Sequence, residues 1–177
     1  MAEDVDREAR FRRVCEAHTA AVLAYALRRT SRDDAADVVA ETFLVAWRRL
    51  DDVDERTVLP WLYAVARNVL LSQQRATRRQ QAIAERVAAA LPEAGEMPSG
   101  SPRVLDALAA LSEGEREVLM LAAWEELSSS EAARVLGCSA TAYRIRLHRA
   151  RKRLRERLDS RVQPPTRAAR AEESAPC

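Results

Sequence analysis

The sequence predicts an all-α protein of two small helical domains joined by a flexible linker, with a helix-turn-helix as the C-terminal domain. Ala, Leu, Arg and Glu dominate the 177 residues, and these residues are strong helix formers. No run of β-branched and aromatic residues predicts a strand. Pro, Gly and Ser interrupt the helical pattern at residues 91–103 and favour a linker. The predicted divisions are residues 8–82, a linker over 83–103, residues 104–160, and a disordered tail over 161–177.

The first domain is predicted to begin with two amphipathic helices. Apolar residues recur at spacings of three and four over residues 11–25, which places them on one helix face. His18 lies on that face, so we expect it to be packed or half-buried and not a ligand. Ser31, followed three residues later by Asp34, predicts the capped start of a second helix that ends near Leu50.

A third helix is predicted over residues 60–79, with Pro60 in its first turn. One of its faces is apolar and is expected to pack inward. The residues of that face are Trp61, Leu62, Val65, Val69 and Leu70. The opposite face is rich in arginine, which suits nucleic acid, although a charged helix face is more often simply solvated.

The second domain carries clear helix start and stop signals. Two serines are followed three residues later by glutamate, the capping-box pattern, and these pairs are Ser112 with Glu115 and Ser128 with Glu131. Gly137 supplies the turn after the helix that begins near Ser129, and Ser139 caps the helix that follows. Apolar residues recur along this last helix at Tyr143, Leu147, Ala150 and Leu154.

The order of capped helix, glycine turn and basic helix is typical of a helix-turn-helix, which places its second helix in the DNA major groove. The chain has 29 basic and 27 acidic residues, so net charge alone does not indicate a DNA-binding protein. The distribution of charge along the chain does indicate nucleic-acid binding, because arginines concentrate in residues 67–86 and 144–161.

No catalytic, metal or cofactor site is predicted. The two histidines lie far apart, and no glycine-rich phosphate loop or nucleophile motif is present. The three cysteines, Cys15, Cys138 and Cys177, lack metal-ligand spacing and do not suggest a disulfide. A charged N-terminus and the lack of a long apolar run lead us to expect a cytoplasmic protein that is not inserted in a membrane.

Three stretches in this order, residues 33–50, 60–79 and 111–154, resemble a bacterial RNA polymerase sigma factor of the sigma-70 family, in its small extracytoplasmic-function (ECF) form. The resemblance implies a transcription initiation factor without enzyme activity or cofactor. It also implies core RNA polymerase and promoter DNA as partners, with an anti-sigma factor as a further family expectation.

The resemblance assigns the first domain to polymerase binding and to the minus-10 promoter element. The polymerase-binding positions are Asp37, Glu41, Thr42 and Trp47, although Trp47 is also a candidate for the domain core. The minus-10 positions are Trp61, Asn68, Ser72, Arg75, Arg78 and Arg79. Opening the duplex and holding a flipped base costs a few kcal/mol, which a pocket and cationic contacts can offset. The chain departs from frequent family residues at Ala40 and at residues 72–74.

The second domain is assigned in the same way to the minus-35 element. Base-reading positions are Arg144, Ile145, His148 and Arg149, and phosphate-contacting positions are Arg146, Arg151 and Ser139. Residues 139–145 depart from the frequent family sequence, and Ile145 replaces a polar reader, so it contacts a thymine methyl or no base.

Two other functions fit parts of the sequence. The first is a helix-turn-helix regulator that binds DNA without polymerase. The second is a degenerate sigma-like module that binds polymerase but not promoters, which the departures at Ala40, Ser72 and Ile145 favour.

Overall fold

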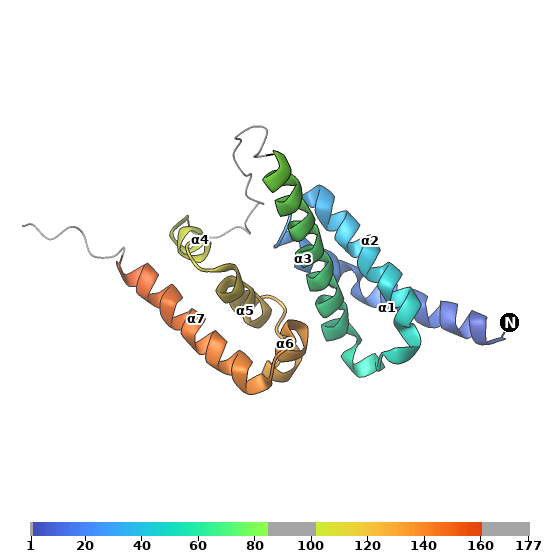
Figure 1. Ribbon diagram of the computed structural model, residues 1–177. Coiled ribbons are helices and arrows are strands. Elements are labelled where there is room, and N and C mark those ends of the chain that lie inside the picture. Colours follow the sequence, from blue (N-terminus) through green and yellow to red (C-terminus); the bar gives the residue numbers. More distant parts are fainter. Residues whose placement is uncertain (1, 85–101, 161–177) are drawn as a thin grey trace, which may run out of the picture.

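The computed structural model describes residues 2–84 and 102–160, and every regular element in these ranges is helical. The first half of the chain contains α1 (Ala2–Leu27), α2 (Arg32–Arg49), two short 3-10 turns (Leu50–Asp52 and Glu55–Thr57) and α3 (Val58–Ala84). The second half contains α4 (Pro102–Ala109), α5 (Glu113–Ala123), α6 (Ser129–Leu136) and α7 (Ala140–Ser160) (Figure 1). The all-α prediction is confirmed for the described residues. The linker is predicted over residues 83–103, but residues 83–84 end α3 and residues 102–103 begin α4. Residues 85–101 and the predicted tail lie outside the described ranges.

Helix α2 begins where its sequence predicts, whereas α1 begins at Ala2, before the predicted residues 11–25, and α3 begins at Val58, two residues before Pro60. The Asp34 amide donates to the Ser31 hydroxyl oxygen at 3.2 Å, which satisfies one free N–H at the start of α2. Acidic residues in the first turn of α2 and basic residues in its last turn complement the helix dipole. Pro60 lies in the first turn of α3, where its missing N–H costs nothing.

The predicted caps and turn of the second half are also present. Both capping boxes form, with the serine and glutamate of each pair bonded to the backbone of the other. Gly137 has φ 65° and ψ 37°, a left-handed conformation that favours glycine, and it ends α6. The Ala142 amide then donates to the Ser139 hydroxyl at 3.1 Å, so Ser139 caps α7.

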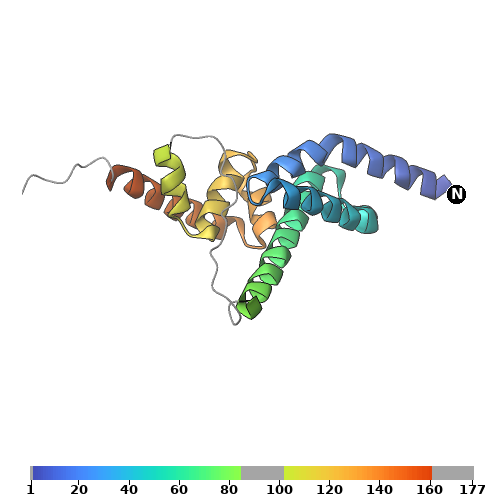
Figure 2. The same cartoon turned by 90° about the horizontal axis from the view of Figure 1, so that it is seen from above.

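The two halves pack directly against each other. Helix α3 lies against α6 in both views of the fold (Figures 1 and 2). One continuous apolar core contains residues of α1, α2 and α3, and it also contains Val118, Leu121, Val135 and Tyr143 of the second half. A smaller second core joins α4, α5 and α7 through Leu108, Leu111, Leu119 and Ala150. The sequence predicted two separate domains but gave no sign of this shared core.

No helix within residues 2–84 or 102–160 is long and apolar enough to cross a membrane.

Candidate nucleic-acid interface

Helix α7 is held in place by its apolar face. The Tyr143 side chain is only 1% exposed, and its hydroxyl donates to the Val118 carbonyl of α5 at 3.3 Å. Burial raises the pKa of this phenol above its ordinary value. Ala150, seven residues later on the same face, is fully buried. The buried face of α7 therefore fixes its rotation, and the other face must point to solvent.

The exposed face of α7 carries every minus-35 position that the sequence predicts. Ser139, Arg144, Ile145, Arg146, His148, Arg149 and Arg151 are all exposed. Within the described residues no carboxylate pairs with the first three turns of α7: Arg144 donates to the Thr141 hydroxyl at 3.2 Å, and the ion pairs of Lys152 with Glu156 and of Arg153 with Glu115 lie farther along. The start of α7 therefore presents positive charge that makes no ion pair with an acidic residue of the described ranges.

Four of the predicted minus-10 positions form a stripe along α3. Asn68, Ser72, Arg75 and Arg79 are exposed and follow each other at spacings of four, three and four residues. The side chains of its two arginines lie along the helix. Arg75 Nε donates to the Leu71 carbonyl at 3.1 Å, and Arg79 Nε donates to the Arg75 carbonyl at 3.2 Å. We name these four residues the α3 stripe.

The two other minus-10 positions are not part of this stripe. Trp61 is half-buried and packs against the main core, which agrees with its apolar spacing in the sequence. The Arg78 side chain lies outside the described residues.

The predicted polymerase-binding positions on α2 separate into buried and exposed residues. Asp37 and Glu41 are exposed, whereas Thr42 is completely buried and its hydroxyl has no hydrogen-bond partner among the described residues. The Thr42 side chain therefore offers no surface to a partner and belongs to the core. Helical spacing agrees with this burial, because Thr42 lies four residues after the buried Val38, whereas the family resemblance had assigned Thr42 to polymerase binding.

Trp47 is intermediate between these two groups. It is 37% exposed, and its ring lies 5.1 Å from Phe11 and 4.9 Å from the Arg7 guanidinium. Leu44, which the sequence analysis missed, is 50% exposed and shares a helix face with Asp37 and Glu41. The sequence signal that could have found Leu44 is its position three residues after Glu41, which places this apolar residue on the same polar helix face.

The histidine and cysteine residues considered as metal ligands are not gathered into a site in the described residues. His18 is half-buried as predicted, and burial lowers its pKa. Cys15 and Cys138 are unpaired thiols, and burial is the main cause that raises the pKa of Cys15. Within the described residues no group of His, Cys, Asp and Glu is arranged to hold a metal ion.

Comparison with known proteins explains this arrangement. The family model described as Sigma-70 region 2 matches residues 14–80, and the one described as Sigma-70, region 4 matches residues 102–154. The RNA polymerase sigma factor CnrH of Cupriavidus metallidurans is 36% identical over 143 residues, covering 72% of this chain and 74% of CnrH. The chain belongs to the sigma-70 family. The ECF RNA polymerase sigma factor SigL of Mycobacterium tuberculosis, 32% identical over 152 residues with 81% and 86% coverage, supports the ECF form.

Solved structures of sigma factors have the same fold. The sigma factor RpoE of Bartonella quintana, in complex with the anti-sigma factor NepR, aligns with a TM-score of 0.67 and 28% identity, covering 84% of this chain and 96% of RpoE. CnrH in complex with the cytosolic domain of CnrY aligns with a TM-score of 0.58 and 33% identity, covering 85% and 88%. This sigma factor therefore has region 2 in α1 to α3 and region 4 in α4 to α7, and it directs promoter-specific transcription initiation.

Proposed function

We propose that this sigma factor reads the minus-35 element with the start of α7 and the minus-10 element with the α3 stripe, while α2 binds core RNA polymerase. The observation that carries the proposal is the exposed arginine face at the start of α7, which has no ion pair with the described residues and follows a capped α6 and the Gly137 turn. That arrangement brings cations and a helix N-terminus to one surface, as DNA binding requires.

The exposed residues of α7 and its cap differ in the DNA group that each suits. Arg144, His148 and Arg149 have side chains suited to base edges, and an arginine can bond both O6 and N7 of a guanine. Ser139 lies at the helix N-terminus, where backbone N–H groups favour a phosphate. Ile145 is 48% exposed on the same surface, and a thymine methyl is the base group that it can contact.

The α3 stripe suits single-stranded DNA. It spans the 12 residues from Asn68 to Arg79, or about 17 Å of helix, which is long enough to follow a few nucleotides. Its arginines supply contacts to the phosphates of the DNA strand, and Asn68 and Ser72 supply short polar groups near the bases. We keep Arg78 in this set from the family pattern and Trp61 as a half-buried edge of the site.

The polymerase-binding face consists of Asp37, Glu41 and Leu44, with Trp47 beside them. An apolar side chain beside charged residues is a common arrangement in an interface, where the apolar centre is desolvated and the charges orient the partner. Thr42 is not included because it is buried.

Two further parts of the proposal rest on the relatives. RpoE and CnrH were solved with NepR and with CnrY, so we include an anti-sigma factor among the partners of this chain. We place the action of this sigma factor in the cytoplasm, together with core polymerase, and we assign the sigma factor no catalytic step.

Transcription by purified core polymerase on a library of genomic fragments, with and without this protein, tests the proposal. We expect specific transcripts that need both proteins. Specific DNA binding by the protein alone, without any such transcript, would support a regulator that acts without polymerase. Polymerase binding without any specific transcript would support the degenerate module instead.

A further inference from the structure

A cavity of about 490 Å³ lies between the two halves of the molecule. Arg67 of α3 borders it on one side, and residues of α5, α6 and α7 border it on the other. Small-molecule sites typically have volumes of about 300 to 1,000 Å³ and often form where two parts of a protein meet. The cavity therefore has the size and the position of a ligand site.

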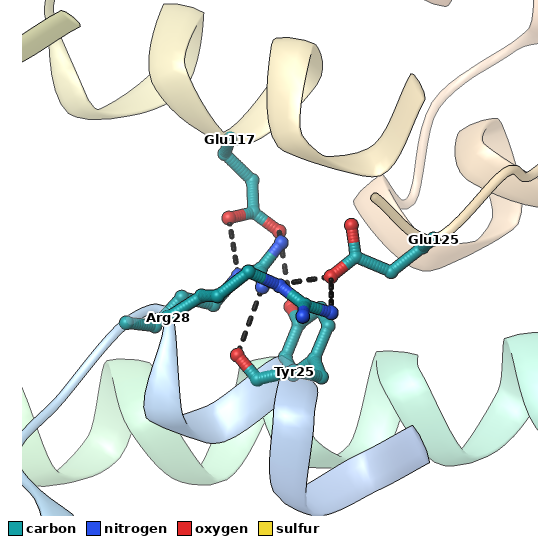
Figure 3. A network of polar contacts seen from close by, with 5 residues as sticks. Tyr25, Arg28, Glu117 and Glu125 are labelled. Carbon is teal, nitrogen blue, oxygen red and sulfur yellow. Dashed lines mark hydrogen bonds and ion pairs between the residues drawn. The ribbon is translucent and has the colours of Figure 1, made fainter. Parts of the chain in front are cut away.

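The acidic residues at this cavity are each bonded to a cation of the chain. The pairs are Glu115 with Arg153, Glu117 with Arg29, and Glu156 with Lys152. In Figure 3 the Glu117 carboxylate points toward Tyr25, whose hydroxyl donates to it at 3.0 Å, and Arg29 Nε donates to it at 2.8 Å. These carboxylates therefore have partners of their own and do not offset the other cations of the cavity.

Three arginines at the cavity have no such partner. Arg67, Arg146 and Arg149 border it, and none of them makes an ion pair or a side-chain hydrogen bond with the described residues. Arg67 is half-buried, whereas the two arginines of α7 are exposed. Like charges around one space repel each other, and an anion in that space relieves the repulsion. We call the space bordered by these three arginines the basic cavity.

The start of α5 adds a backbone donor to the basic cavity. The N–H of Gly114 is one of the free groups that a helix N-terminus has, and a Cβ at this residue would meet nothing within 4 Å. A ligand can therefore approach this amide closely. The donor is secondary to the arginines, because Glu113 and Glu115 lie in the same turn and offset the helix dipole.

The three arginines define the chemistry of the ligand. A guanidinium can donate two parallel hydrogen bonds to one phosphate, and it keeps its charge at neutral pH. Val118 and Leu136 also border the cavity and offer an apolar surface beside the cations. A chain of linked phosphates matches this set, either as a bare chain or as part of a nucleotide whose base lies on the apolar surface.

We propose that the basic cavity binds a short polyphosphate chain through Arg67, Arg146 and Arg149, and that the bound anion competes with promoter DNA for the two arginines of α7. Only the competition rests on the proposed function. Binding of the anion is a separate claim, which can be measured without polymerase or DNA.

The first experiment measures binding of sodium tripolyphosphate to the full chain by isothermal titration calorimetry. We expect one saturable site, and an affinity about tenfold lower in Arg67→Met, because charge-assisted bonds to the phosphates are lost. Arg75→Met is the matched control, since it removes the same charge from an exposed position of α3 outside the cavity. Equal affinities in these two variants would overturn the site, because they would indicate diffuse attraction to a basic surface.

A second pair of variants keeps this test decisive if Arg67→Met disturbs the packing of α3. Arg149→Met should also lose about tenfold in affinity, whereas Arg144→Met, on α7 but outside the cavity, should bind like the wild type. Circular dichroism checks the helix content of each variant. Titration with ATP distinguishes the two sources of the phosphate chain: tighter binding than tripolyphosphate indicates a nucleotide, and equal binding indicates the bare chain.

The last experiment measures promoter-specific transcription at limiting concentrations of this protein, preincubated with tripolyphosphate at constant free Mg²⁺ and ionic strength. We expect the anion to lower the yield of the wild type, and to lower the yield of Arg67→Met much less, each relative to its own yield without the anion. An equal fall in both would overturn the competition. Failure of the proposed function has a different signature: no promoter-specific transcript with or without the anion, whatever the calorimetry shows.

Discussion

The arginines just after α1 and those on α7 are the same residue type in opposite surroundings. The Arg29 side chain is 8% exposed and bonded to Glu117 and Glu125 of the other half, whose carboxylates are drawn in Figure 3. Arg149 is exposed and makes no ion pair with the described residues. A buried guanidinium with matched acids stabilises one arrangement of the chain, whereas an exposed one without them is available to an anionic partner. Exposure and pairing, and not residue type, therefore separate the structural arginines from the proposed DNA-binding ones.

The largest expected effect comes from Arg29→Met. This change leaves Glu117 and Glu125 buried without their main partner, which costs about 3 to 5 kcal/mol in comparable sites. We expect the free energy of unfolding, measured by urea denaturation, to fall by about 3 kcal/mol or to split into two transitions as the halves separate. Arg32→Met, an exposed arginine three residues later, is the control and should change it by less than about 0.5 kcal/mol. Equal losses in both variants would contradict the comparison.

The second effect concerns promoter affinity rather than stability. Arg149→Ala should weaken binding of the polymerase complex to the minus-35 element by about 1 to 3 kcal/mol, because a bidentate base contact is lost. Its urea denaturation should match the wild type, in contrast to that of Arg29→Met. Arg155→Ala, exposed farther along α7 and outside the proposed reading set, is expected to have a smaller and sequence-independent effect. Unchanged promoter affinity in a filter-binding or fluorescence assay removes Arg149 from the site.

A third prediction tests whether the turn positions the exposed arginines. Gly137→Ala places a Cβ at φ 65° with no neighbour within 4 Å, so backbone strain is its only cost, about 1 kcal/mol. We expect a small loss of thermal stability, and weaker minus-35 binding only if α7 shifts. Gly114→Ala, at an open position near the start of α5, should not lose stability. A loss in Gly114→Ala as large as that in Gly137→Ala would show that the left-handed turn is not the cause.

The smallest effect is a pH dependence at the cap of α5. The Ser112 hydroxyl bond is the main cause that lowers the pKa of Glu115 below its ordinary value of 4.5, and Arg153 of α7 adds to it. Because the folded-state pKa is the lower one, this stabilisation is complete above about pH 4.5 and is lost as the pH falls through the folded-state pKa. Glu115→Gln should make thermal stability less sensitive to pH in this range. An identical pH profile in the wild type and in this variant would contradict the assignment.

Local features of the fold were predictable because their causes lie within a few residues. Ser112, Ser128 and Ser139 cap helices as expected, and Gly137 adopts the left-handed turn. The exposed face of α7 also follows from spacing, since Tyr143 and Ala150 must point inward. A helix period is sufficient to divide such a helix into a buried and an exposed face.

Features that depend on distant partners were not predictable in this way. Arg29 and Glu117 are 88 positions apart, and nothing in the local pattern distinguishes Arg29 from the solvated arginines near it. Thr42 has a polar side chain but is buried, and Leu44 is apolar but exposed, because packing of α2 against α1 and α3 decides their surroundings. Sequence spacing assigns a face, but only the neighbouring helices determine what that face contacts.

The central claim is that the exposed arginines of α7 read promoter DNA, whereas the buried arginines bonded to Glu117 and Glu125 stabilise the fold. The most direct test is the yield of promoter-specific transcripts from purified core polymerase, at limiting concentrations of wild-type protein, Arg149→Ala and Arg155→Ala. We expect a yield well below the wild type for Arg149→Ala and a yield nearer the wild type for Arg155→Ala. Equal yields from the two variants, with both remaining fully helical, would contradict the claim.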